Sequence, residues 1–189
     1  MNPLVRLLVL VPAALVAACA EFAFLLPGET VDFELNGRIA VRYRDDASSG
    51  NIAWRHRADG DEVLLTTPLG QGVARIVRAG DGVTLTTADA KEHRAADAET
   101  LTESVLGFRL PLSGLADWVR GRPGAGPAGA TRDTQGRLAR LEQSGWTVEY
   151  LEYGENRLPS RMKLAYPGIE IRLAIGEWKT GGVADGRSP

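Results

Sequence analysis

Apolar residues that alternate with polar ones restrict the fold of this 189-residue chain more than any other feature of its sequence. The clearest example is residues 34–44, where every second residue is apolar or glycine, so that these residues would share one side of a strand. The residues on that side are Leu35, Gly37, Ile39, Val41 and Tyr43. A period of two is typical of a β-strand that has one face in the protein interior and one face in water. Residues 34–44 are therefore predicted to form a strand.

Shorter segments of the same character follow, separated by residues that favour turns. The further predicted strands are residues 51–56, 62–67, 73–78, 83–87, 137–143, 146–150, 161–166 and 169–175. Tight turns such as Pro167-Gly168 indicate an antiparallel meander and not an alternation of strands and helices. Residues 45–50 are expected to form a turn-rich break, and the Gly-, Pro- and Ala-rich residues 122–130 a loop.

Two segments in the middle of the chain follow a helical period instead. Residues 97–107 place Ala98, Leu101 and Val105 on one face, and residues 111–121 begin with proline and end with glycine. A large sheet tends to curl, and helices across its inner face would cap an apolar interior. The predicted fold class is therefore mainly β: an incomplete (open) antiparallel β-barrel of about ten to eleven strands, with short helices capping a hydrophobic cavity.

Cys19 is the only cysteine in the chain, and it ends an apolar run that follows Arg6. A basic start, a short apolar core and small residues before a cleavage site are typical of a secretory signal peptide. Residues 15–19, with the sequence Leu-Val-Ala-Ala-Cys, are similar to a bacterial lipobox. Residues 1–18 are therefore predicted to be removed and Cys19 to be lipidated. Ala20 follows, in place of the aspartate that favours the inner membrane, and so indicates the outer membrane.

The rest of the chain has the size of one domain. Residues 19–31 are expected to be the acylated cysteine and a linker, residues 32–180 a single domain, and residues 181–189 a flexible tail. Without Arg6, the 22 basic residues fall to 21, against 24 acidic residues. This balance gives no sign of a nucleic-acid partner or of an anionic membrane surface, which would call for clustered positive charge.

Few residues could perform chemistry. His56 and His93 are the only histidines; we assign the first to the polar side of its strand, opposite Trp54, and the second to a charged turn or strand end. Two distant histidines without a free thiol do not suggest a metal site. Asp59 and Asp61 flank a glycine, and we attribute them to turn chemistry instead of a catalytic pair. The sequence therefore predicts no enzyme, no cofactor and no metal site.

Several local patterns, none of them specific alone, occur in a recognisable order. They are Asn36-Gly37-Arg38-Ile39-Ala40-Val41, Trp54, Pro68-Leu69-Gly70, Asp97-Ala98-Glu99, Pro111-Leu112 through Leu115, Trp118 to Gly121-Arg122-Pro123, Gly145-Trp146-Thr147-Val148-Glu149-Tyr150 and Leu158-Pro159-Ser160-Arg161-Met162. Together with the lipobox, their order and spacing resemble the family of the outer-membrane lipoprotein receptor LolB. The resemblance extends from about Phe33 to Trp178.

This resemblance implies a receptor that accepts triacylated lipoproteins from the periplasmic carrier LolA and inserts them into the inner leaflet of the outer membrane. The receptor would itself be lipid-anchored there, facing the periplasm, and a monomer. By motif, the exposed leucine that the family needs for delivery is Leu69, in the membrane-insertion loop Pro68, Leu69 and Gly70. The short segment after Cys19 implies that the family's N-terminal helix is abbreviated or missing.

An acyl-chain cavity is expected to be lined by the apolar side of the strands and helices. The residues predicted to line it are Ile39, Val41, Trp54, Leu65, Leu101, Val105, Leu115, Trp118, Trp146, Leu164 and Leu173. Two alternatives stay open. An envelope lipid- or fatty-acid-binding lipoprotein would have the same barrel and interior. A structural assembly scaffold would have a filled core, and the alternation of residues is the same for a hollow and a filled barrel.

Overall fold

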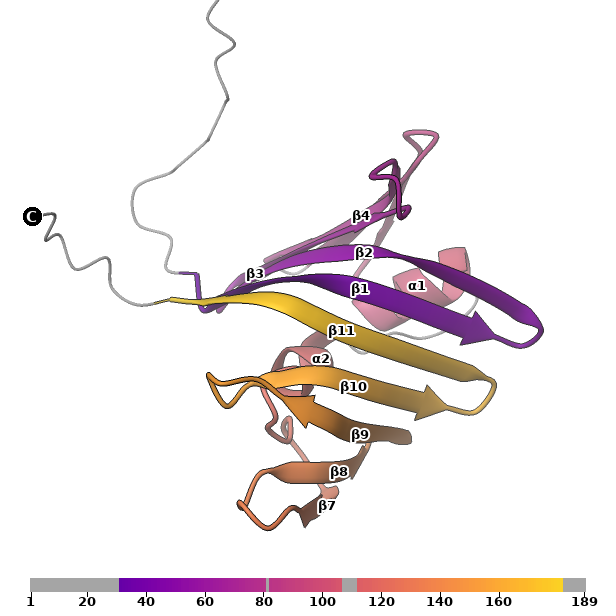
Figure 1. Cartoon of the computed structure of the whole chain (residues 1–189). Helices are drawn as coiled ribbons and strands as arrows, with labels where there is room; N and C mark the ends of the chain where they lie inside the picture. The colour runs from indigo at the N-terminus through magenta and orange to yellow at the C-terminus, as the bar shows by residue number, and fades with distance from the viewer. Residues whose placement is uncertain (1–30, 81, 107–111, 182–189) are drawn as a thin grey trace, which may run out of the picture.

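The computed structural model describes residues 31–80, 82–106 and 112–181, which form one curved antiparallel sheet and two short helices (Figure 1). The elements in chain order are β1 (Phe33–Tyr43), β2 (Asp46–Arg57), β3 (Gly60–Thr66), β4 (Gly72–Ala79), β5 (Gly82–Thr87), β6 (Glu92–Ala95), α1 (Ala98–Leu106), α2 (Leu112–Trp118), β7 (Ala128–Arg132), β8 (Leu138–Gln143), β9 (Trp146–Tyr153), β10 (Pro159–Tyr166) and β11 (Ile169–Thr180). Across the sheet the order is β6-β5-β4-β3-β2-β1-β11-β10-β9-β8-β7. The predicted fold class is confirmed, because the described strands form an open eleven-stranded sheet with β6 and β7 at its edges.

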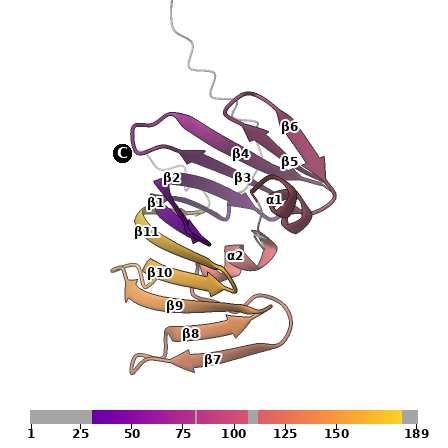
Figure 2. The same ribbon diagram turned by 90° about the vertical axis from the view of Figure 1, so that its right-hand side faces the viewer.

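Both helices lie on the concave side of the sheet, as Figure 2 shows. Alternate strand residues point to this side and pack with α1 and α2 in one hydrophobic cluster. Its fully buried members include Phe33, Leu35, Ile76, Leu85, Leu101, Leu112, Leu138, Leu141, Met162 and Leu164.

Neither of the two described helices is long and apolar enough to cross a membrane. The predicted signal peptide, Cys19, most of the predicted linker and nearly all of the predicted tail lie outside the described residues.

The predicted break at residues 45–50 is wrong. β2 begins at Asp46, which pairs with Tyr43 of β1, so the hairpin turn consists of only Arg44 and Asp45. The first four residues of β2 are exposed on both faces of this hairpin. These residues pair with β1 through the backbone and bury no apolar side chains. Their sequence therefore lacks the alternation that predicts a strand.

The predicted loop at residues 122–130 is wrong at its end. Residues 128–132 form the edge strand β7, which pairs with β8 through the backbone. Every residue of β7 is exposed, so its small and polar side chains gave no strand pattern. The Gly-, Pro- and Ala-rich composition predicted a loop, but backbone pairing with β8 makes residues 128–132 a strand.

The antiparallel order gathers alternate turns at one end of the sheet. The turns after β1, β3, β5, β8 and β10 lie at the same end, on the right in Figure 1. Phe33 and Thr180, which begin β1 and end β11, are paired at the opposite end. We call the first end the Leu69 end, because the turn between β3 and β4 contains that residue.

Candidate functional site

The concave interior brings together all of the residues predicted to line a cavity. Seven of them are buried in the hydrophobic cluster: Trp54, Leu101, Leu115, Trp118, Trp146, Leu164 and Leu173. The other four are partly buried and pack against it: Ile39, Val41, Leu65 and Val105. The contact of these side chains with an acyl chain stays a prediction. The prediction omitted Leu35, Val148 and Met162, which are buried on the same strand faces and which the same alternation could have supplied.

A pocket of about 400 Å³ opens between α2 and the start of β9. Three aromatic rings line it: Trp118 and Trp146 have centroids 6.4 Å apart, and Trp146 and Tyr166 have centroids 5.3 Å apart. The polar lining residues include Glu99, Asp117, Gln143 and Ser144. Because Trp146 follows the β8–β9 turn, this aromatic pocket lies toward the Leu69 end of the sheet. An aromatic wall with a polar rim suits a ligand that has both an apolar and a polar part.

Hydrogen bonds to buried side chains attach the end of α2 to β8 and β9. The Nε1 atom of Trp118 donates to Oε1 of Gln143 over 2.8 Å, and Gln143 also bonds the backbone of Gly124. The hydroxyl of Tyr150 donates to the carbonyl oxygen of Trp118 over 3.0 Å. Burial raises the pKa of Tyr150 far above its usual range, so this hydroxyl keeps its proton. In contrast, α1 packs against β5 and β6, so the two helices contact opposite halves of the sheet.

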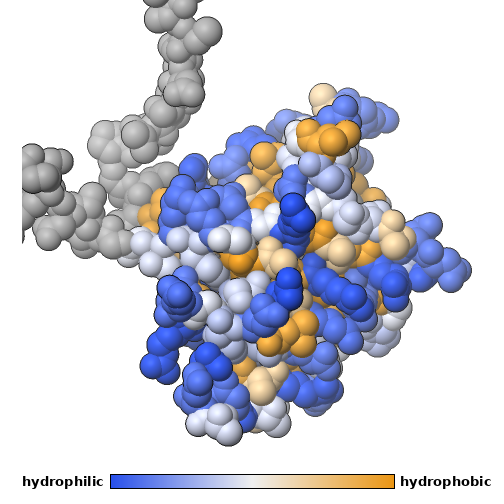
Figure 3. Space-filling model, in the orientation of Figure 1, coloured by the Kyte–Doolittle hydropathy of each residue, from blue (hydrophilic) through white to orange (hydrophobic). Residues whose placement is uncertain are grey.

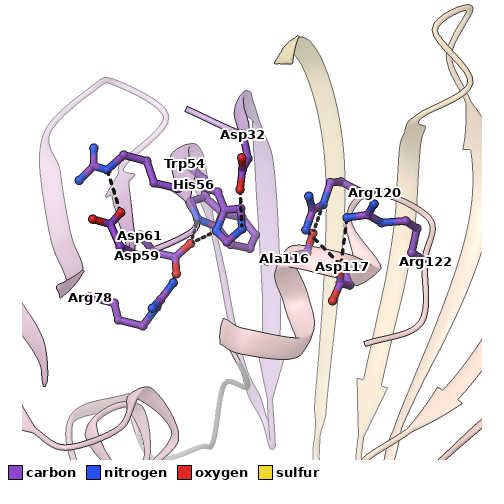
Figure 4. A network of polar contacts seen from close by, with 11 residues as sticks. Asp32, Trp54, His56, Asp59, Asp61, Arg78, Ala116, Asp117, Arg120 and Arg122 are labelled. Carbon is purple, nitrogen blue, oxygen red and sulfur yellow. Dashed lines mark hydrogen bonds and ion pairs between the residues drawn. The ribbon is translucent and has the colours of Figure 1, made fainter. Parts of the chain in front are cut away.

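A buried carboxylate organises the other half of the interior (Figure 4). Asp61 has 1% of its surface exposed and accepts hydrogen bonds from Trp54 Nε1 over 2.9 Å, His56 Nδ1 over 2.6 Å and Arg78 Nε over 2.7 Å. Burial opposes ionisation, but the bonds from His56, Trp54 and Arg78 outweigh it and hold the pKa of Asp61 below its usual value. Asp61 is therefore an anion that joins β2, β3 and β4.

This network corrects two assignments made from the sequence. His56 lies on the same face as Trp54, since residues two apart in a strand point to the same side. Its side chain is only 12% exposed and its ring lies 4.9 Å from that of Phe33, so it is not a solvated surface residue. Asp61 belongs to β3 and not to the turn, which consists of Ala58 and Asp59. The period of two in β2 and β3 could have predicted both placements, that of His56 on the face of Trp54 and that of Asp61 on the inner face of β3.

The turn between β3 and β4 holds Leu69 away from the protein. The backbone nitrogen of Gly70 donates to the carbonyl of Thr67 over 2.9 Å, and that of Thr67 donates to the carbonyl of Gln71 over 2.8 Å. Asn51 of β2 donates to the Thr67 carbonyl over 3.1 Å. Gly70 has a φ of 87°, which favours glycine at this position. Leu69 is 91% exposed, more than any other large apolar residue in the described part of the chain.

Comparison with known proteins identifies the family. The profile of the family described as outer membrane lipoprotein LolB matches residues 31–178, which contain nearly the whole sheet. The chain belongs to the LolB family. An outer-membrane lipoprotein LolB from Thiobacillus denitrificans is 44% identical over 147 residues, which are 77% of this chain and 79% of the relative. Another, from Azoarcus sp., is 38% identical over 178 residues, covering 89% of this chain and 92% of the relative.

Two solved structures are similar at low sequence identity. A DUF1329 family protein from Desulfovibrio piger has a TM-score of 0.50 at 8% identity and covers 86% of this chain and 89% of its own. A LolA superfamily protein from Nitrosomonas europaea has a TM-score of 0.48 at 12% identity, with 85% and 90% covered. At such identities a structural likeness concerns the fold alone.

Membership of the LolB family confirms three predictions made from the sequence. The family itself was identified correctly. The protein is an outer-membrane lipoprotein receptor, as the resemblance implied. It is located at the outer membrane of a Gram-negative bacterium as a lipid-anchored protein.

Proposed function

We propose that this LolB-family receptor accepts triacylated lipoproteins from the periplasmic carrier LolA in its concave interior and inserts them into the inner leaflet of the outer membrane. The observation that carries the proposal is Leu69, which is 91% exposed on a hydrogen-bonded turn. The aromatic pocket lies toward the same end of the sheet. A cargo chain that leaves the pocket would therefore emerge where Leu69 contacts lipid.

The size of the hydrophobic effect explains why such a receptor is needed. Each methylene group removed from water contributes about 0.8 kcal/mol, so three acyl chains released into water would cost on the order of tens of kcal/mol. Cargo must therefore pass from one apolar site to the next without full exposure. A difference in affinity of about 1.4 kcal/mol between two sites gives a tenfold bias in direction. This passage breaks no covalent bond, which supports a receptor without catalytic groups.

Loading of cargo requires the interior to open. A pocket of about 400 Å³ offers too little room for three long acyl chains, because the hydrophobic cluster occupies the space behind it. The helices contact opposite halves of an open sheet, so a wider sheet would draw α1 away from α2. We infer that cargo chains replace contacts between the helices and the sheet.

Cys19 would anchor the receptor after residues 1–18 are removed. Residues 19–31 would then be its tether, residues 32–180 the binding domain and residues 181–189 a tail.

Transfer of a radiolabelled lipoprotein from the carrier tests this function directly. The acceptor is a form that lacks residues 1–19, which keeps every described strand and helix. We expect the label to move from the carrier to this acceptor in solution, without vesicles. A receptor that takes up free fatty acids but leaves the lipoprotein on the carrier would support a lipid-binding protein instead. A protein that takes up neither would support a scaffold.

Trp118 should report the arrival of cargo in the aromatic pocket. In a chain in which Trp54, Trp146 and Trp178 are replaced by phenylalanine, we expect a saturable change in Trp118 fluorescence on addition of an acylated peptide. The reason is that Trp118 lines the pocket and would exchange its present surroundings for an acyl chain. The matched control keeps only Trp178, whose Nε1 bonds Pro159 at the opposite end of the sheet. An equal response of both proteins would contradict binding at the pocket.

A further inference from the structure

The outer face of the sheet, which is turned away from the helices, carries a groove of about 670 Å³. Figure 3 shows this face as largely hydrophilic, with small hydrophobic areas between hydrophilic side chains. Ala40, Ala174 and Leu151 provide apolar surface in the groove. Pro68, from the turn that carries Leu69, also lines it. The groove therefore continues from the middle of the sheet to the loop that we expect to contact the membrane.

Basic side chains surround this groove. The basic residues that line it are Arg38, Arg161, Lys163 and Arg172. A smaller groove of about 220 Å³ adjoins it, since Ala40, Ser49 and Arg172 line both, and it extends to Arg42 near the β1–β2 turn. We call these two neighbouring cavities together the outer groove. Its basic residues come from three strands, β1, β10 and β11, and so they do not form a cluster in the sequence.

Acidic neighbours neutralise only part of this charge. Arg172 pairs with Glu170 at 2.9 Å, and Arg161 pairs with Glu152 at 2.9 Å. Lys163 lies 3.5 Å from Glu170, which lines the smaller cavity, and 3.7 Å from Glu149. Arg38 and Arg42 have no ion-pair or hydrogen-bond partner among the described residues. Both are exposed on the outer face of β1. The outer groove is therefore locally cationic, although the whole chain has a net charge of −2.

We propose that the outer groove binds the headgroups of anionic phospholipids when the Leu69 loop meets the membrane. Charge complementarity supports this occupant, because the unpaired guanidinium groups of Arg38 and Arg42 match a phosphate. The apolar surface of Ala40 and Leu151 suits the carbon chains next to that phosphate. Continuity with Pro68 places the groove beside the point of insertion. The inference rests on the proposed membrane contact of Leu69 and adds the lipid chemistry that the receptor recognises.

The two contacts would together set the orientation of the receptor. A single inserted leucine leaves the protein free to tilt and rotate on the membrane. A second contact along the outer face of β1 would remove much of this freedom, because the groove and the loop lie on adjoining surfaces. The Leu69 end, toward which the aromatic pocket lies, would then stay at the membrane, and the rest of the concave side would remain open to the carrier.

Vesicle binding tests the proposal. We would measure cosedimentation of the form that lacks residues 1–19 with phosphatidylcholine vesicles, with and without phosphatidylglycerol. A basic residue close to an anionic leaflet strengthens binding by about fivefold, so Arg38→Gln with Arg42→Gln should weaken binding to anionic vesicles by about twentyfold to thirtyfold. Binding to neutral vesicles should not change, and added salt should remove the difference.

The matched control removes the same charge elsewhere. Arg132→Gln with Arg157→Gln changes two exposed arginines in the β7–β8 region and the β9–β10 turn, away from the Leu69 end. This control should bind both kinds of vesicle as the parent protein does. An equal loss for both double variants would show that net charge matters and the outer groove does not. Equal binding of the parent to neutral and anionic vesicles would also overturn the proposal.

A separate readout distinguishes this inference from the proposed function. Transfer of lipoprotein from the carrier in solution uses no vesicles, so the Arg38→Gln, Arg42→Gln variant should accept cargo at the rate of the parent. If this transfer were slowed while vesicle binding stayed normal, the outer groove would bind the carrier and the lipid assignment would be wrong. If the parent accepted no cargo but still preferred anionic vesicles, the proposed function would fail and the lipid site would stand.

Discussion

Replacing Leu69 with glutamate should stop delivery of cargo into vesicles while the receptor stays folded and still accepts cargo from the carrier. The side chain is 91% exposed, so its removal takes no apolar contact from the core. Burial of a leucine contributes about 1.5–3 kcal/mol, which corresponds to a loss of about tenfold to a hundredfold in membrane contact. The charge of glutamate adds a further penalty in lipid. The measurement is the amount of labelled lipoprotein that a preloaded receptor passes to vesicles.

Leu64→Glu is the matched control for this experiment. Leu64 is 40% exposed on the outer face of β3 and lies outside the β3–β4 turn. This variant should deliver cargo as the parent does, since only the turn is expected to enter the membrane. Circular dichroism during heating would confirm that both variants unfold like the parent. Delivery by Leu69→Glu at the parent's rate would contradict a membrane role for the loop.

Replacing Asp61 with alanine should lower the free energy of unfolding by about 3–5 kcal/mol. The change leaves the buried donors of Trp54 and His56 without their acceptor and leaves Arg78 without its anion. Urea unfolding at neutral pH would measure the loss. Asp59→Ala is the control, because the Asp59 side chain is 80% exposed, and it should change the free energy by less than about 0.5 kcal/mol. Equal effects of the two substitutions would contradict a structural role for the network.

The carboxylate of Asp61 should also make the free energy of unfolding depend on pH. The pKa of Asp61 is held below its usual value in the folded protein, so the unfolded chain takes up the proton first as the pH falls through about 4. The stabilisation by Asp61 is complete above that pH and is lost as the pH falls through the lower pKa of the folded state. The difference in unfolding free energy between the parent and Asp61→Asn should therefore shrink from pH 7 to pH 3. A constant difference would show that the charge of Asp61 contributes nothing.

The sequence predicted the interior well because a single physical rule governs it. In a half-buried strand every second residue is apolar, so the alternation around Ile39 and that around Leu173 both identify the inner face without knowledge of the partner strands. The same rule failed where both strand faces meet water. Residues 46–49 and strand β7 have no inner face, and only their pairing with β1 and β8 makes them strands.

Contacts between distant residues account for the remaining differences. His56 and Asp61 look like surface residues in the sequence, because a histidine near charged residues and an aspartate beside a glycine are common in turns. Strand pairing places them opposite each other and next to Arg78 from a third strand. The charge of the outer groove has the same origin, since Arg38 and Arg172 are far apart in the sequence and meet on neighbouring strands. The alternation could assign each of these residues to a face of its own strand, but it contains no information on which strands pair and therefore on which residues meet.

In the turn that carries Leu69, the shape of the backbone and the chemistry of the exposed side chain are set by different residues. Its hydrogen bonds use backbone atoms and the side chains of Thr67 and Asn51, and the side chain of Leu69 takes no part in them. The hydrogen bonds that shape the turn therefore do not depend on the Leu69 side chain. Substitutions at position 69 should therefore alter the proposed membrane contact of the turn without lowering the stability of the fold.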